Sequence, residues 1–149
     1  AQAANLNAPS ALALDSAGNL YISDTYNCIV RKVTPSGMIS TVAGARQRGY
    51  SGDGNPAITA QLADPNGIAV ASDGTLYIGD RLNHRVRKVS SDGTISTIAG
   101  TGVQGLSGDG GPAVDAQFGY VSRVQLDSDG GLLISDQTNS RIRKILPPL

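Results

Sequence analysis

The chain repeats itself three times with a period of 56 residues, and this repeat constrains its fold more than any other feature. The segment GNLYISD at 18–24 recurs as GTLYIGD at 74–80 and as GGLLISD at 130–136. A fixed period of this length predicts a repeat architecture in which each unit packs on the next. Three polar residues keep the same register in every copy: Asp24, Asp80 and Asp136; Asn27, Asn83 and Asn139; Arg31, Arg87 and Arg143.

Each repeat contains four short segments with strand character. In the first repeat these are residues 12–14, 20–23, 29–33 and 39–42. They alternate or are β-branched, and Gly, Asp, Asn or Pro bounds each of them. Because the connections between them have hairpin length, we expect an antiparallel meander of four strands.

A long link follows each fourth strand. In the first link Asn55 and Pro56 are typical of the N-cap and first residue of a helix, and they predict a short helical turn over 57–62. Leu62 ends this turn, and Phe118 and Leu6 occupy the same register in the other repeats. We expect these three apolar side chains to pack against the blades and so hold the links in place.

Composition supports an all-β chain and excludes several functions. All twelve acidic residues are Asp, and 19 of the 149 residues are Gly, so turn formers are abundant and helix-forming Glu is absent. The formal charge is zero, which disfavours nucleic-acid binding, and the single Cys rules out an internal disulfide. No apolar run reaches the length of a membrane span. We therefore expect no nucleic acid and no membrane as partner.

The motifs GNLYISDxxN, RKV and SGDGxPAxxAQL together resemble the NHL repeat, in the long-loop subtype of many bacterial secreted proteins and of the teneurin propeller. The resemblance covers residues 6–145. It implies an all-β fold of β-propeller blades: three four-stranded antiparallel units, the last lacking its outer strand. The blades are expected at about 6–43, 62–99 and 118–146, with long loops at 44–61 and 100–117, in a single propeller segment over 1–149. It also implies an extracellular or periplasmic location.

Three full periods would need 19 residues more than the chain has, and this difference corresponds to 38–56. Propellers of this family have about six blades, so the resemblance implies half a ring with an open strand edge at 141–145. Two copies related by a two-fold axis would close six blades, and we expect this homodimer. The alternative is a piece of a larger propeller.

The only His and the only Cys do not form a catalytic set. Cys28, His84 and Ser140 share one register after the repeated Asn, and we expect surface turn residues there. One imidazole and one thiol are too few for a zinc site. A Ser nucleophile would have only His84 as its base. The sequence thus predicts no catalytic residue, no metal and no cofactor.

The repeated Asp and Arg are interpreted as structural, because a catalytic pair is needed once whereas every blade needs its turn. We expect the Asp to accept N–H groups across the following turn and the Arg to bridge blades. Asp53 and Asp109 lie in Ser-Gly-Asp-Gly loops that we interpret as ordinary turns, with calcium binding as the alternative. Asp127 and Asp129 resemble part of a calcium loop that lacks its Glu.

The third repeat departs from the others in its first strand. Arg123 replaces Ala11 and Gly67, and Gln125 replaces Ala13 and Ala69. In a propeller the first strand lines the axial channel, so Arg123 and Gln125 are candidate ligand-binding residues. The alternative is drift in a terminal repeat.

Two functions follow as hypotheses. The first is a non-catalytic NHL propeller scaffold that offers Asp24–Cys28, Arg81–His84, Gln137–Ser140 and the Ser-Gly-Asp-Gly loops to a protein or glycan. The second is part of a propeller enzyme of the lactonase or lyase type, with its catalytic residues in other blades. The inner strands of these three repeats carry no cluster of acids and His for such an enzyme.

Overall fold

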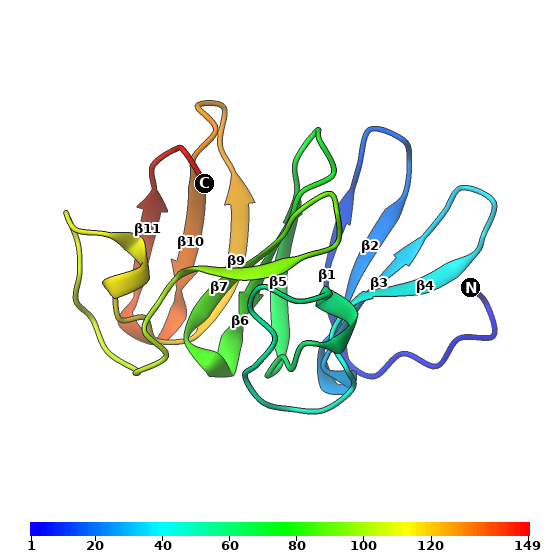
Figure 1. Ribbon diagram of the computed structural model, residues 1–149, viewed down its shortest axis with the longest axis horizontal. Coiled ribbons are helices and arrows are strands. Elements are labelled where there is room, and N and C mark those ends of the chain that lie inside the picture. The colour runs from blue at the N-terminus through cyan, green and yellow to red at the C-terminus, as the bar shows by residue number, and fades with distance from the viewer.

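The computed structural model describes residues 1–149 as three antiparallel sheets arranged like the blades of a fan (Figure 1). The first sheet contains β1 (Pro9–Leu14), β2 (Leu20–Asp24), β3 (Ile29–Val33) and β4 (Ile39–Ala43). The second contains β5 (Pro65–Val70), β6 (Leu76–Asp80), β7 (Arg85–Val89) and β8 (Ile95–Ala99). The third contains β9 (Val121–Leu126), β10 (Leu132–Asp136) and β11 (Arg141–Ile145).

The strands of each sheet follow one another in chain order, so every sheet is a meander. This confirms the expected fold class: β-propeller blades with four strands in the first two units and three in the last. Strand β1 is longer than the segment 12–14 expected from the sequence. It pairs with β2 from Leu14 back to Pro9, with a β-bulge between Pro9 and Ala11. None of the short helical turns could span a lipid bilayer.

The helical turn in the long link is shorter than expected. It is a single 3₁₀ turn over Ala57–Thr59, and no side chain caps it. The Asn55 side chain donates instead to the carbonyl oxygen of Asp53 at 3.3 Å. Leu62 and Phe118 are buried as expected, but Leu6 is exposed, because no complete 3₁₀ turn and blade face enclose it at the start of the chain.

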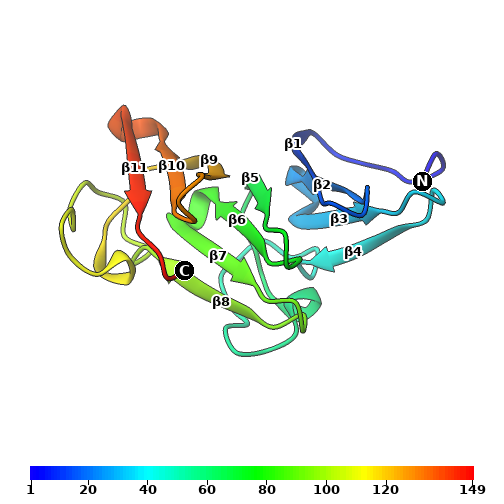
Figure 2. The same cartoon turned by 90° about the horizontal axis from the view of Figure 1, so that it is seen from above.

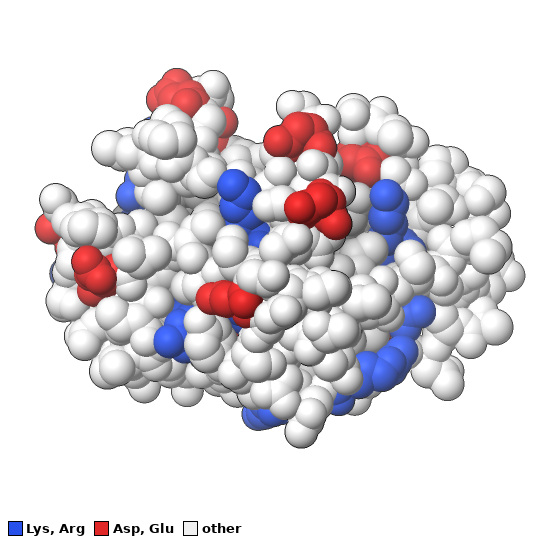
Figure 3. Space-filling model, viewed as in Figure 1, with Lys and Arg blue, Asp and Glu red and all other residues white.

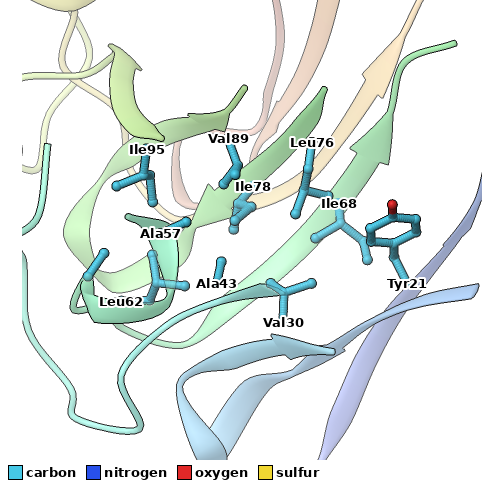
Figure 4. Close-up of a cluster of buried hydrophobic side chains, with 11 residues drawn as sticks. Tyr21, Val30, Ala43, Ala57, Leu62, Ile68, Leu76, Ile78, Val89 and Ile95 are labelled. Atoms are coloured by element: carbon cyan, nitrogen blue, oxygen red, sulfur yellow. The ribbon is translucent and has the colours of Figure 1, made fainter. Parts of the chain in front are cut away.

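The core consists of two clusters, each lying between two neighbouring blades rather than inside one. The first brings together residues of the first blade, of the link and of the second blade (Figure 4). The first blade supplies Tyr21, Val30 and Ala43, the link supplies Ala57, Ala60 and Leu62, and the second blade supplies Ile68, Leu76, Ile78, Val89 and Ile95. The second cluster repeats this arrangement between the second and third blades. Burial between blades therefore holds the fan together.

The inner strands β1, β5 and β9 converge, whereas β4 and β8 lie on the outside (Figure 2). Gly67 makes this convergence possible, since a Cβ on it would collide with the backbone of Arg123 in β9. The turns after β2, β6 and β10 lie at the same end of the fan as the long links. Edge strand β11 carries no further strand, as expected for 141–145.

Candidate functional site

The second blade shows most completely what the repeated polar residues do. Asp80 is fully buried at the end of β6, and its Oδ1 accepts a hydrogen bond from the Ala63 backbone N–H at 2.7 Å. Its Oδ2 accepts from Asn83 Nδ2 at 2.8 Å and from Arg87 Nη1 at 3.3 Å. Ala63 belongs to the link before the blade and not to the turn after Asp80. The carboxylate thus fastens the incoming link, which differs from the expected contact across the turn.

Arg87 fastens the same link at a second place. Its side chain is fully buried, and Nη2 donates to the carbonyl oxygen of Ser51 at 3.0 Å and to Asp53 Oδ1 at 2.6 Å. Asn83 Nδ2 also donates to the carbonyl oxygen of Gly49 at 2.7 Å. Because residues 49–53 leave the first blade, Arg87 and Asn83 join two neighbouring blades through their loop.

Tyr50 belongs to this loop, and its ring contacts two guanidinium groups. Its ring centroid is 3.7 Å from the Arg85 guanidinium and 4.9 Å from that of Arg87, both within the range of a cation–π contact. Its hydroxyl donates to Asp53 Oδ2 at 3.0 Å. The Asp53 carboxylate therefore has one hydrogen-bond partner within its loop, Tyr50, and one in β7, Arg87.

The third blade repeats this network with one difference in exposure. Asp136 accepts from the Gly119 N–H and from Asn139 Nδ2, each at 2.8 Å. Arg143 Nη2 donates to Asp109 Oδ1 at 2.6 Å, and Asp109 is largely exposed. The loop at 107–110 is thus held as the loop at 51–54 is, but without an outer strand beside it.

The first blade retains only half of the network. Asp24 accepts from the Asn7 N–H at 2.7 Å and from Asn27 Nδ2 at 2.8 Å, so the incoming link is fastened. Arg31 forms no ion pair, and its Nε donates over a long 3.4 Å to the carbonyl oxygen of Ser40. Arg31 is therefore the repeat residue whose usual aspartate partner is absent.

Burial raises the pKa of Asp80 to about 6, against the opposing hydrogen bonds from Asn83, Ala63 and Arg87. For Asp53 the balance is reversed. Partial burial pushes its pKa upward, but the hydrogen bond from Thr97 and the charge of Arg87 outweigh this, so its pKa is lowered. The fully buried carboxylate and the half-exposed one therefore bind protons in different pH ranges.

The three residues that follow the repeated Asn share a left-handed backbone conformation, with φ of 55° at Cys28, 54° at His84 and 52° at Ser140. Ser140 is exposed, as expected. Cys28 is buried, so the expectation of a surface turn residue is wrong there: the chain returns at Gly44, where a Cβ would collide with the Cys28 carbonyl oxygen.

His84 is half-buried and held between two contacts. Its Nδ1 is 2.8 Å from the carbonyl oxygen of Gly119, and its ring stacks on Tyr120 with 5.8 Å between centroids and 14° between planes. The Arg81 guanidinium lies 4.3 Å from the Tyr120 ring centroid. The single imidazole of the chain thus packs between the second and third blades, without a Ser or Asp side chain on its nitrogens.

A polar cleft of about 490 Å³ lies where the inner strands β1, β5 and β9 begin, on the end that carries the long links. Two register positions of the repeat supply most of its lining. One is the residue after the repeated Asp, and the other is the second residue of each inner strand. These are Thr25, Arg81 and Gln137, and Ser10, Asn66 and Ser122. Thr25, Arg81 and Gln137 lie within the face expected from the sequence, whereas Ser10, Asn66 and Ser122 were not anticipated, although both positions are polar in all three repeats.

Arg123 lines this cleft and also a groove of about 380 Å³ along the inner strands. Gln125 lines the groove only. Both side chains are exposed, and Arg123 and Arg81 form no ion pair with a carboxylate. The inner-strand side of the three blades therefore presents two guanidinium groups without a carboxylate partner, Arg123 and Arg81, near the polar cleft, and the amide of Gln125 further along the groove.

The two other calcium candidates, Asp127 and Asp129, lie in the turn between β9 and β10. Asp127 Oδ1 accepts from the N–H groups of Asp129 at 2.9 Å and of Gly131 at 2.8 Å, and its Oδ2 pairs with Lys144 at 2.5 Å. The hydrogen bond from Lys144 lowers the pKa of Asp127. No group of three or more His, Cys or Asp side chains in the structure is placed to hold a metal ion.

The face shown in Figure 3 has no continuous field of one charge. Acidic side chains are scattered singly over it, and basic ones form a short stripe at its lower right margin. This mixed pattern agrees with the zero formal charge.

Comparisons with known proteins show a similarity to NHL-repeat proteins. A model of the teneurin NHL domain matches residues 45–107. Teneurin-3 of Mus musculus is 33% identical over 154 residues, which cover 94% of this chain and 5% of that protein. The chain therefore spans only a small part of the curated relatives that it matches.

Solved structures show the same similarity in three dimensions. A protein of unknown function from Bacteroides thetaiotaomicron has 33% identity and a TM-score of 0.76, over 85% of this chain and 32% of that one. A gluconolactonase from Xanthomonas campestris has 14% identity and a TM-score of 0.67, over 97% of this chain and 45% of that one. The second similarity concerns the fold alone.

Proposed function

Since this chain belongs to the NHL-repeat β-propellers, we propose that it is a non-catalytic scaffold that associates with a second copy to complete a ring. The completed ring would offer its long-loop end, with the polar cleft at the channel mouth, to a protein or glycan. Propellers of one fold carry unrelated functions, so the argument has to come from the residues of this chain.

The use of the charged groups supports a non-catalytic role. Asp24, Asp80 and Asp136 are fully buried and saturated by link N–H groups and by the repeated Asn. The single imidazole, His84, is packed on Tyr120. A general acid or base has to reach a substrate proton, and these groups are committed to holding links and blades together.

The observation that carries the association is the state of the two outer blade faces. On one side Leu12 is 65% exposed, whereas its repeat equivalents Ile68 and Val124 are 6% and 5% exposed within the two core clusters. On the other side Ile142 is 71% exposed, whereas its equivalents Val30 and Val86 are completely buried. The exposed face of the first blade thus corresponds to one side of the blade–blade interface within this chain, and the exposed face of the third blade corresponds to the other side.

A second copy fits these faces better than an unrelated partner. The repeat equivalents of the two faces already pack on each other between neighbouring blades, so the two faces are complementary. Head-to-tail contact between the third blade of one copy and the first blade of the next would bury both. Two such contacts around a two-fold axis give six blades, and closed two-fold assemblies are the commonest oligomers.

Sedimentation velocity of single-residue variants tests the association. Leu12→Asp and Ile142→Asp each place a carboxylate in the proposed contact, and both side chains are exposed in the isolated chain, so its fold is preserved. We expect each variant to sediment as a monomer where the unmodified protein is dimeric. Val103→Asp is the control, since Val103 is 57% exposed in a link loop, belongs to no blade strand and does not line the cavity at the open edge of the third blade.

Dimers that persist in both face variants would refute this contact. Dissociation by Val103→Asp to the same extent would show that any added charge acts, and would also refute it.

A further inference from the structure

Two arginines of the polar cleft, Arg81 and Arg123, occur once each and do not recur in the other repeats. The equivalents of Arg81 are Thr25 and Gln137, and those of Arg123 are alanine and glycine. A residue that holds the blades together is needed in every repeat, as Asp80 and its equivalents are, whereas a residue that binds a ligand is needed once. The two cleft arginines are therefore candidates for binding a ligand.

Arg81 is held in place without using its hydrogen-bond donors. Its guanidinium lies over the Tyr120 ring, 4.3 Å from the centroid, and the same ring stacks on His84. The His84 Nδ1 is 2.8 Å from the Gly119 carbonyl oxygen, so the two rings are fixed in turn. A cation–π contact leaves the N–H groups of a guanidinium free to bind a planar anion such as a carboxylate. Arg81 is thus pre-organised for a ligand.

The cleft carries a positive charge although the formal charge of the chain is zero. Its lining contains one carboxylate, Asp64, and this group pairs with Arg48 at 2.6 Å. Arg81 and Arg123 form no ion pair, so two positive charges remain without a partner. Carboxylates are the groups that guanidinium binds most specifically, through two parallel hydrogen bonds. The electrostatics of the cleft therefore favour a ligand that carries carboxylates.

The other side chains of the cleft suit a sugar. Tyr26 lines it and is 61% exposed, and an exposed aromatic ring offers a flat surface to the apolar C–H face of a pyranose. Asn66 and Gln137 carry amides without a hydrogen-bond partner in the chain, since only their backbone groups are bonded. An amide both donates and accepts, as a sugar hydroxyl does. A simple anion would leave Tyr26 and both amides unused.

We infer that the cleft binds an acidic glycan, whose uronate carboxylates pair with Arg81 and Arg123 while a sugar ring packs on Tyr26. The volume of about 490 Å³ lies within the range of about 300–1,000 Å³ that is typical of ligand sites. The inference rests on the proposed role of the cleft as the ligand-binding part of the scaffold, and it specifies the class of ligand.

The probes are two acidic trisaccharides, trigalacturonate and trimannuronate, titrated calorimetrically into the unmodified protein at low ionic strength. Their methyl esters are the matched neutral ligands, since they keep the rings and lose the charges. We expect at least one acid to bind about tenfold or more tightly than its ester. Arg81→Gln and Arg123→Gln should each weaken binding of that acid about tenfold and affect the ester less. Tyr26→Ala should weaken the acid and the ester alike, because both offer the same ring faces.

Arg46→Gln is the matched control, because Arg46 is exposed in the first link and does not line the cleft. This variant removes the same charge and should bind the acid as the unmodified protein does. Arg123 and Tyr26 are exposed, so their variants keep the fold and test the site even if Arg81→Gln disturbs the contact with Tyr120.

Absent binding of both acids, equal binding of acid and ester, or binding that neither arginine variant weakens would each overturn the inference. A tetra-aspartate peptide that binds where both sugars fail would also overturn it, in favour of an acidic peptide. Failure of the proposed function has different signs. A monomeric mass refutes the ring closure and leaves the site intact, since one chain supplies the whole lining, and new reducing ends from the probes refute the non-catalytic role.

Discussion

Replacing Arg87 by Gln tests the idea that the repeated polar residues hold the blades together. The substitution removes a fully buried guanidinium that pairs with Asp53 and Asp80, and it leaves the Asp80 carboxylate buried without its cation. Removing one partner of a buried ion pair costs about 3–5 kcal/mol. With a change in midpoint of about 2–4 °C per kcal/mol for a chain of this size, the midpoint of unfolding should fall by about 6–20 °C.

The matched control is Arg31→Gln, at the same register of the first blade. Because Arg31 has one long hydrogen bond and no ion pair, its loss should cost less than about 1.5 kcal/mol. Thermal and urea unfolding followed by circular dichroism measures both variants, at one protein concentration so that association contributes equally. Equal losses in the two variants would refute the assigned role of the network.

Three further predictions concern single features. Gly44→Ala should destabilise the protein by about 1–3 kcal/mol more than Gly37→Ala in urea unfolding, because both have positive φ but only Gly44 abuts the Cys28 backbone. Equal costs would contradict this. Asp80 should titrate near pH 6 in carboxyl carbon NMR. Its contribution to the free energy of unfolding should be complete below about pH 4 and should be lost as the pH rises to about 6, because the folded state holds the proton more tightly than the unfolded chain. A midpoint below 4 would contradict the effect of burial. A chelator should leave the midpoint of unfolding unchanged, and a drop of several degrees would show that the Gly-Asp-Gly loops or Asp127 bind an ion.

The blades could be predicted from the sequence because each strand carries its own local signal. Segments such as 20–24 and 29–33 are β-branched or alternating and end at Asp, Asn or Gly, and their threefold recurrence removes the ambiguity of any one copy. The missing outer strand of the third blade followed from the same register. These features depend on near neighbours in the chain.

Features that depend on distant residues were harder to predict. The carboxylate of Asp80 binds the N–H of Ala63, 17 residues earlier, and nothing in the local sequence distinguishes that donor from those of the next turn. Cys28 is buried because the chain returns at Gly44, and Leu6 is exposed because its surroundings are incomplete.

The polar cleft shows the same limit. It combines Thr25, Arg81 and Gln137 from three separate turns, which meet only because β1, β5 and β9 converge. These three residues were expected on one binding face, but Ser10, Asn66 and Ser122 were not expected beside them. A comparison of the repeats position by position, asking which variable positions stay polar, would have identified the latter three.

The mass of the unmodified protein in solution tests the central claim most directly, because the two exposed faces either close on a second copy or remain free. Light scattering at micromolar concentration should give twice the 15.2 kDa of a single chain. A stable, monodisperse species at 15.2 kDa would contradict the closed ring.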